Sequence, residues 1–271
     1  MRLASLAVLV VLGTAAPPRR SAAQVPLAPS AATGLSVTPA FEGWYRNADG
    51  TYSLSFGYFN RNTAQVLSIP TGPDNFISPG ASNQGQPTSF YPRRHWGVFA
   101  VRVPADFGDK KVVWTIKSGD RTYAIPGSLR EEWQIDALEG EAGSNNTPPA
   151  LSFSDKGPAA RGPGGISVSR TATVGAPITI TVIAVDDGAG LTKGGYPVTL
   201  AWFTHQGPAP VAFSVPVVKL TPKGGTTTTT ATFTTPGDYV LRVRATDSDV
   251  AAGGHSQCCW SNAFVNVRVT P

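Results

Sequence analysis

The amino-acid sequence predicts an all-β protein built from two antiparallel β-sandwich domains. Three observations lead to this fold class. Gly (29) and Pro (24) are both frequent among the 271 residues, and both residue types favour turns over helix. Short apolar segments alternate with polar positions at a period of two, which is typical of half-buried strands. Hydrophobic residues make up 41% of the chain, which is too large a share for a disordered protein.

The N-terminus predicts export from the cytoplasm. Arg2 precedes an apolar run over residues 3–12, and small residues follow it before residue 24. This is the order of a secretory signal peptide, so we assign residues 1–23 to the signal and residues 24–38 to a flexible leader. The run is shorter than the about 20 apolar residues of a transmembrane helix. We therefore expect a secreted, periplasmic or cell-surface protein with no membrane span after signal removal.

The charge balance excludes nucleic acid as a partner. The whole chain has 22 Lys+Arg against 17 Asp+Glu, a formal charge of +5, and signal removal takes away three of the arginines. Nucleic-acid binding needs a clustered basic face, and the pairs Arg93-Arg94 and Lys110-Lys111 form no such cluster.

The first domain spans residues 39–138 and holds 16 of the 25 aromatic residues. Residues 51–58 alternate strictly, with one face formed by Tyr52, Leu54, Phe56 and Tyr58. The preceding Asp49-Gly50 supplies a tight turn and pairs this strand with one at 41–45. Further strands are expected at 66–69, 97–103, 112–116 and 122–125. Residues 129–138 also alternate, so we favour a last strand there over a short helix.

A Pro- and Gly-rich stretch at residues 139–165 predicts a linker, and the second domain follows over residues 166–271. Seven strands are expected in it, at 166–174, 178–185, 198–203, 217–220, 226–234, 239–246 and 263–269. Seven short strands separated by Gly/Pro turns are typical of an antiparallel sandwich.

The end of the second domain resembles a known family. Residues 234–249 read TTPGDYVLRVRATDSD and lead to a final strand at 263–269, and residues 180–188 (ITVIAVDDG) fit the same pattern. These segments resemble polycystic-kidney-disease (PKD) and related bacterial immunoglobulin-like domains. At the place of the PKD family's Trp-x-Phe-Gly-Asp-Gly, residues 201–207 read AWFTHQG, so we adopt the wider immunoglobulin-like assignment. The resemblance implies an immunoglobulin-like fold and the role of a spacer or adhesion module on a secreted or surface protein.

The sequence carries no motif of a known catalytic class. P-loop, G-x-S-x-G, H-E-x-x-H and strand-linked G-x-G-x-x-G patterns are all missing. His95, His205 and His255 are far apart in the sequence, and none adjoins a nucleophile motif. The neighbours Glu131 and Glu132 point to opposite faces if they lie on a strand, so they do not form a glycosidase pair by themselves. We predict a non-enzymatic protein. The alternative is an extracellular hydrolase, or an accessory domain of one, with a dispersed site around His95.

Candidate ligand-binding residues lie in the first domain: Trp44, Tyr45, Arg93, Arg94, His95 and Trp96. The last four follow a long polar segment at 75–89 and belong to an apparent loop, where binding residues are common. Aromatic rings and guanidinium groups together suit sugars or acidic groups. The competing interpretation, which we favour, is that Trp96 begins the strand up to residue 103 and packs inside, while Arg93 and Arg94 are solvated.

The two cysteines of the chain are the neighbours Cys258 and Cys259. Adjacent Cα atoms are about 3.8 Å apart, below the usual disulfide range. An oxidising compartment nevertheless favours a strained vicinal disulfide. Reduced thiols, an intermolecular bridge, and metal ligation together with His255 are the alternatives.

Four aspartates form a weak calcium candidate: Asp186, Asp187, Asp247 and Asp249. Both pairs follow strands, and strand-end loops of such sandwiches gather at the two ends of the domain. Calcium takes six to eight oxygen ligands. The alternative is that these are ordinary turn residues whose carboxylates accept bonds from their own backbone. No other cofactor is expected.

The sequence as a whole predicts a secreted, non-enzymatic binding or structural module. Its ligand would be extracellular or part of the cell envelope, a glycan or a protein, held by the aromatic first domain with the second domain as a spacer. A further alternative is an adhesive or assembly protein that acts through exposed sheet edges.

Overall fold

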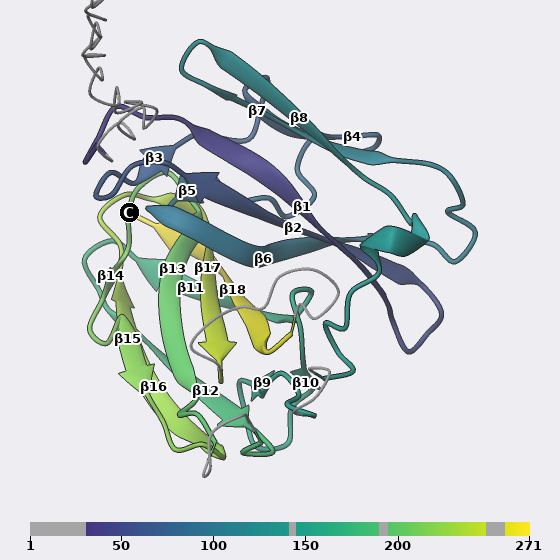
Figure 1. Ribbon diagram of the computed structural model, residues 1–271. Helices are drawn as coiled ribbons and strands as arrows, with labels where there is room; N and C mark the ends of the chain where they lie inside the picture. The colour runs from purple at the N-terminus through teal and green to yellow at the C-terminus, as the bar shows by residue number, and fades with distance from the viewer. Residues whose placement is uncertain (1–30, 141–144, 190–194, 248–257) are drawn as a thin grey trace, which may run out of the picture.

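The computed structural model describes residues 31–140, 145–189, 195–247 and 258–271, and these form two β-sandwiches that pack on each other (Figure 1). The described residues contain strands and one short 3-10 helix, η1 (Glu131–Trp133). None of their helices is long and apolar enough to cross a membrane. The signal assigned to residues 1–23 lies outside the described residues. The predicted all-β class with two sandwiches, the second immunoglobulin-like, is confirmed.

The first sandwich pairs two three-stranded sheets around an aromatic core. One sheet has the order β1 (Val37–Arg46), β2 (Tyr52–Asn60), β6 (Arg93–Val103), and the other β4 (Asn75–Ser78), β7 (Val112–Ser118), β8 (Arg121–Gly127). The short strands β3 (Leu67–Ser68) and β5 (Ser89–Phe90) form a two-stranded sheet beside them. The rings of Phe56, Phe99 and Trp114 meet at the centre, with centroids 5.0–6.2 Å apart. This packing explains much of the aromatic enrichment of the domain.

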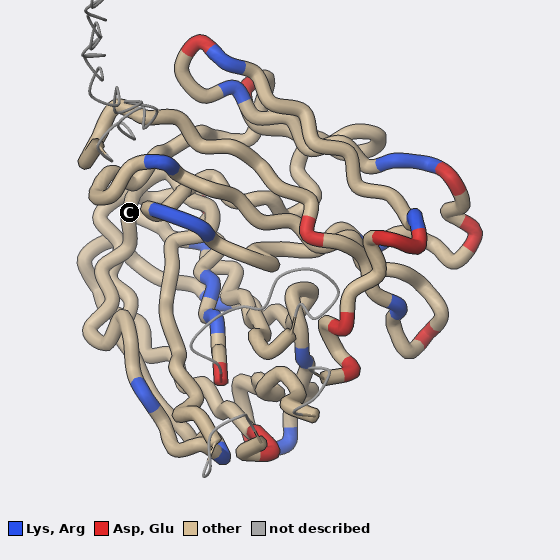
Figure 2. The backbone as a smooth tube through the Cα atoms, in the orientation of Figure 1, with Lys and Arg blue, Asp and Glu red and all other residues tan. Residues whose placement is uncertain are grey.

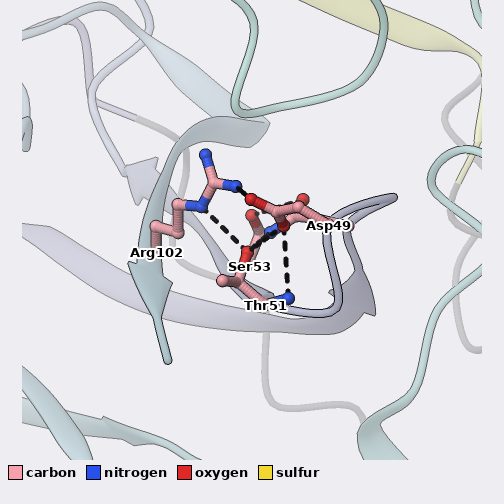
Figure 3. Close-up of polar contacts among 5 residues, drawn as sticks. Asp49, Thr51, Ser53 and Arg102 are labelled. Carbon is pink, nitrogen blue, oxygen red and sulfur yellow. Dashed lines mark hydrogen bonds and ion pairs between the residues drawn. The ribbon is translucent and has the colours of Figure 1, made fainter. Parts of the chain in front are cut away.

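Strands β1 and β2 form a hairpin whose turn lies at Asp49-Gly50, as predicted. Asp49 Oδ1 accepts hydrogen bonds from the backbone N–H of Thr51 (3.2 Å) and from its hydroxyl (2.6 Å). From β6, Arg102 donates to Thr51 Oγ1 at 2.8 Å and pairs with the Asp49 carboxylate (Figure 3). The hydroxyl of Thr51 is the main cause that lowers the pKa of Asp49. The turn thus also ties the ends of the three strands together.

Strand β2 is buried on both faces rather than on one. Leu54, Phe56 and Tyr58 lie in the core as the alternation predicts, but Ser53 and Ser55 on the opposite face are buried too. A period-two pattern indicates one apolar face, and it does not show that a polar face will be covered by another part of the protein.

Three local predictions for the first domain were wrong. Strand β6 begins at Arg93, so residues 93–96 belong to a strand and not to a loop. The polar segment 75–89 contains β4 and part of β5, because Asn75–Ser78 pairs with β7. Residues 129–138 form η1 and irregular chain, with a single bridge from Gln134 to Trp44, so no strand forms and Glu131 and Glu132 lie in a helical turn.

The second sandwich consists of two five-stranded sheets. One has the order β11 (Ile166–Thr173), β18 (Trp260–Thr270), β17 (Gly237–Thr246), β13 (Thr199–Gln206), β15 (Val217–Lys219). The other has the order β10 (Ala159–Ala160), β9 (Ala150–Ser152), β12 (Ile178–Val185), β16 (Gly224–Thr232), β14 (Ala212–Phe213). Each of the seven predicted strands has its counterpart. The pairing of β11 with β18 is parallel, and the others are antiparallel.

The segments assigned to leader and linker carry structure where they are described. Residues 31–36 hydrogen-bond to the loop at 60–65, for example from Leu35 N to Asn62 Oδ1 at 2.7 Å. Within residues 139–165, β9 pairs with β12 and β10 pairs with β9. This part of the chain therefore extends a sheet of the second sandwich.

The two sandwiches meet along β5 and β6 on one side and β13, β17 and β18 on the other, a contact region that we call the junction. Hydrogen bonds cross it between backbone atoms and from side chains to backbone. Thr88 N donates to His205 O at 2.8 Å, and Asn262 Nδ2 donates to Gly97 O at 2.7 Å. The two sandwiches are thus joined by hydrogen bonds as well as by packed side chains.

Gly97 shows how closely the domains approach. A Cβ at this position would lie 2.1 Å from Nε1 of Trp260, a buried ring that reaches over from β18. The residue also has a φ of +48°, a left-handed conformation that favours glycine.

We expect the substitution Gly97→Ala to loosen the junction. Gly108→Ala is the matched control, because Gly108 has a similar φ of +58° and nothing within 4 Å of its would-be Cβ. Overpacking costs about 1–3 kcal/mol, so Gly97→Ala should lower the free energy of unfolding by about that much more than Gly108→Ala does. Urea titrations of both variants measure the difference, and equal losses would contradict a close-packed junction.

Candidate functional site

The predicted ligand-binding residues fall into two groups on the sheet of β1, β2 and β6. Arg94 is the centre of the first group. Its Nη2 lies 2.6 Å from Oε1 and 2.7 Å from Oε2 of Glu42, a side chain that is only 3% exposed. Room for this pair is made by Gly57, where a Cβ would lie 2.1 Å from Glu42 Oε1. Sequence reasoning missed Glu42, which shows no local signal beyond being an acidic residue inside a strand.

Burial dominates the electrostatics of Glu42. Removal from water raises the pKa of its carboxyl to about 7, although the neighbouring Arg94 acts in the opposite direction. The desolvation penalty of a buried carboxylate can exceed the attraction of one partner. The pair is therefore a buried, pH-sensitive contact at the centre of the sheet.

The aromatic members of this group are engaged by their neighbours. The guanidinium of Arg94 lies 4.9 Å from the ring centroid of Trp96, and that of Arg93 lies 5.3 Å from the ring of Phe59. Trp44 donates from Nε1 to the carbonyl of Arg130 at 2.7 Å. Tyr45 is buried, and its hydroxyl accepts a bond from Gly164 N at 3.0 Å. These side chains serve contacts within the chain, and the guanidinium of Arg94 lies over the ring of the half-buried Trp96.

His95 is separated from this group because it faces the junction. Its ring stacks on Tyr58 at 5.0 Å and meets the edge of Phe203 from the second sandwich at 5.6 Å. Nε2 lies 3.2 Å from the carbonyl oxygen of Pro92. Burial lowers the pKa of His95 to about 3, so the imidazole is neutral at physiological pH. A hydrolase site around His95 gains no support from this position, which is neither a deep cleft nor a convex surface.

Two arginines that the sequence did not single out, Arg242 and Arg244, occupy the other side of the junction. Figure 2 shows most charged positions at turns and strand ends, but the basic residues of β17 lie inside the strand. Both guanidinium groups of β17 lie over the ring of Phe203, at 4.6 and 5.6 Å. Arg242 is 1% exposed and donates from Nη1 to Asn262 Oδ1 at 3.3 Å and to Val98 O at 3.5 Å. Burial lowers the pKa of Arg242 to about 10.

His205 closes the junction at its other end. Its Nε2 lies 2.7 Å from the carbonyl oxygen of Gly85, and its ring meets Phe264 at 5.3 Å. Burial lowers the pKa of His205 to about 3, so this imidazole is neutral as well. The junction thus combines two neutral histidines, two arginines and several aromatic rings.

The acidic candidates separate into a buried pair and an exposed residue. Asp186 and Asp247 are both buried, and burial raises both pKa values, that of Asp247 to about 8 with the charge of Asp186 adding to the effect. Asp187 is exposed and accepts a bond from Thr147 Oγ1 at 2.6 Å. Asp186 and Asp187 also accept the backbone N–H groups of Gly188 and Ala189, as turn aspartates do.

These aspartates do not assemble a metal centre within the described residues. No group of three or more His, Cys, Asp or Glu side chains in this part of the chain is arranged to hold a metal ion. Asp249, like His255, lies outside the described residues. The calcium site therefore stays a prediction.

Cys258 and Cys259 lie as a vicinal disulfide in the structure, with a sulfur-to-sulfur distance of 2.11 Å. Both cysteines are buried, and each sulfur atom lies 3.1 Å from the carbonyl oxygen of Asn146. Cys259 has a φ of +125°. The bridge precedes Trp260, so it fixes the start of β18 beside the junction.

Comparisons with known proteins give no family for this chain. No protein-family model matches it, so the PKD part of the resemblance finds no support there. No curated protein matches it either.

Among solved structures, domains 4 and 5 of the S-layer protein SbsC are 11% identical, with a TM-score of 0.28, over 79% of this chain and 90% of that one. The D0-D1 domain of intimin is 17% identical, with a TM-score of 0.24, over 86% of this chain and 97% of that one. The D00-D0 domain of intimin is 12% identical, with a TM-score of 0.27, over 87% of this chain and all of that one. Likenesses at these scores carry no argument about what the protein does.

The buried Glu42 predicts a pH-dependent stability. Its pKa is about 7 in the folded state against 4.5 for an exposed glutamate, so the folded protein holds the proton more tightly. Stability contributed by this proton is lost as the pH rises from about 4.5 through about 7. Glu42→Gln, which imitates the protonated form, should match the wild type near pH 5 and exceed its free energy of unfolding by on the order of 2–3 kcal/mol at pH 8. Urea titrations across this range measure it, and parallel curves for the two proteins would contradict it.

The calcium prediction is tested by thermal melts with millimolar calcium and with a chelator. A ligand that binds the folded state raises the melting temperature, so a site should give an increase in the wild type. Asp247→Asn should abolish this increase, whereas an unchanged wild-type melting temperature removes the site.

Proposed function

We propose that the protein is a non-enzymatic binding module that works outside the cytoplasm, with both sandwiches acting as one rigid unit. One observation carries the proposal. Both described histidines, His95 and His205, and the arginine Arg242 are buried in the junction and hold the domains together. Catalytic acids and bases need access to a substrate and a pKa near the working pH, and the two histidines have neither.

In this proposal the junction makes the pair of sandwiches stiff. Domains that are linked by a small polar contact move relative to each other by default. Here buried hydrogen bonds join β-strands of both sandwiches, so a force or a ligand acting on one domain is transmitted to the other. Such stiffness suits a spacer, an adhesin or a ligand-binding module at the cell exterior. The export part of the proposal rests on the predicted signal at residues 1–23.

Within this proposal the ligand is a glycan of the environment or of the cell envelope. Screening the purified mature chain on a glycan array tests it, and retention of one structural class without release of new reducing ends is the expected result. Release of fragments from a retained glycan would contradict the non-enzymatic assignment. Retention of no class would remove the glycan and leave a spacer or adhesive role.

A further inference from the structure

The junction borders a cleft of about 490 Å³ whose walls come from both sandwiches. One wall is the loop around Asn83 and Gly85 together with part of β6. The other wall is formed by β13, β17 and β18, and the glycines at 164–165 lead from it into β11. Ligand sites occur preferentially at domain interfaces, because two elements there can enclose a ligand that neither encloses alone. Neither sandwich by itself would contain this cleft.

The chemistry of the cleft is polar and uncharged. Its lining contains no Lys, Arg, Asp or Glu, and its one histidine, His205, is held neutral by burial. The polar side chains present are the amides of Asn83, Gln206 and Asn266 and the hydroxyl of Ser167. An amide both donates and accepts hydrogen bonds, as a sugar hydroxyl does, whereas a charged ligand would find no counter-ion here.

An oriented aromatic ring completes the cleft. Phe264 on β18 is partly exposed, and its ring meets His205 edge-on with an interplanar angle of 65°. Aromatic faces carry partial negative charge and attract the polarised C–H groups that one side of a pyranose presents. Asn266 is the next residue on the same outer face of the strand, so ring and amide lie side by side.

The walls are fixed before any ligand arrives. Gln206 Nε2 donates to Asn83 Oδ1 at 3.1 Å and to the carbonyl of Gln86 at 2.6 Å, and Asn83 Nδ2 donates back to Gln206 Oε1 at 3.4 Å. These bonds run from one sandwich to the other across the cleft. A site that is already ordered loses little entropy on binding.

We infer that this interdomain cleft binds a neutral oligosaccharide, with Phe264 packing against a sugar ring and Asn266 and Ser167 bonding its hydroxyls. The inference rests on the proposed function as a binding module and assigns it a site. It moves the ligand away from Arg93, Arg94 and Trp96, whose rings and charges are occupied by contacts within the chain.

The experiment uses the mature chain on an array of neutral gluco-, manno- and galacto-oligosaccharides beside sialylated and sulfated glycans. The best neutral binder is then titrated by calorimetry against four variants. Phe264→Leu and Asn266→Ala alter the cleft, and each should weaken binding at least tenfold. Thr270→Ala on the same face of β18 and Arg94→Ala at the other candidate site should bind as the wild type does. Melting curves of all variants check that they are folded.

The outcomes separate the inference from the proposed function. Wild-type binding that Arg94→Ala abolishes and the cleft variants retain would overturn the cleft and keep the binding module. Binding confined to sialylated or sulfated glycans would overturn the neutral ligand class. Absence of binding to any glycan would overturn the inference together with the glycan form of the proposed function. Loss in the folded cleft variants alone supports the cleft.

Discussion

The burial of Arg242 between the two sandwiches is the constraint on which the rest of the structure depends. A guanidinium group taken out of water must have its charge and donors met by neighbouring oxygens and rings, or the folded state loses several kcal/mol. Asn262, the carbonyl of Val98 and the face of Phe203 meet part of this need for Arg242, whose Nε is buried without a hydrogen-bond partner among the described residues. Two of these partners come from the second sandwich and one from the first, so the arginine gains all three contacts only when both domains are in place.

The same constraint explains the state of the junction's histidines. Two positive guanidinium groups in a buried contact oppose any further positive charge, and their effect adds to burial in lowering the pKa of His95. A neutral imidazole can stack on Tyr58 and meet the edge of Phe203 without a counter-ion. His95 and the two arginines, which elsewhere would be candidates for catalysis, thus serve a structural role in the junction.

The junction also determines where a ligand can be held. Because the junction brings the loop around Asn83 against β13, it creates a cleft without charged lining residues, and the Asn266 amide and the Phe264 ring of β18 line it. Elsewhere on the sheet of β1, β2 and β6, Arg94 pairs with the buried Glu42, and its guanidinium lies over the ring of Trp96. The charged pair on the sheet of β1, β2 and β6 therefore serves the stability of the fold, whereas the uncharged cleft at the junction is the site that we propose for the ligand.

The sequence by itself determined the class of fold and the strands with a clear period. Residues 51–58 and 239–246 alternate because one face of each strand is buried in a core. This requirement is local, so the pattern can be recognised in the sequence alone. The short strands β4, β9 and β10 escaped prediction because their pairing partners, and not their composition, make them extended. The sequence singled out neither Arg242 nor Glu42, because it shows which face of a strand is polar and not what lies on top of that face. Only the packing of one sandwich on the other decided that these charges are buried, that His95 is neutral, and that a cleft lies between Asn83 and Phe264.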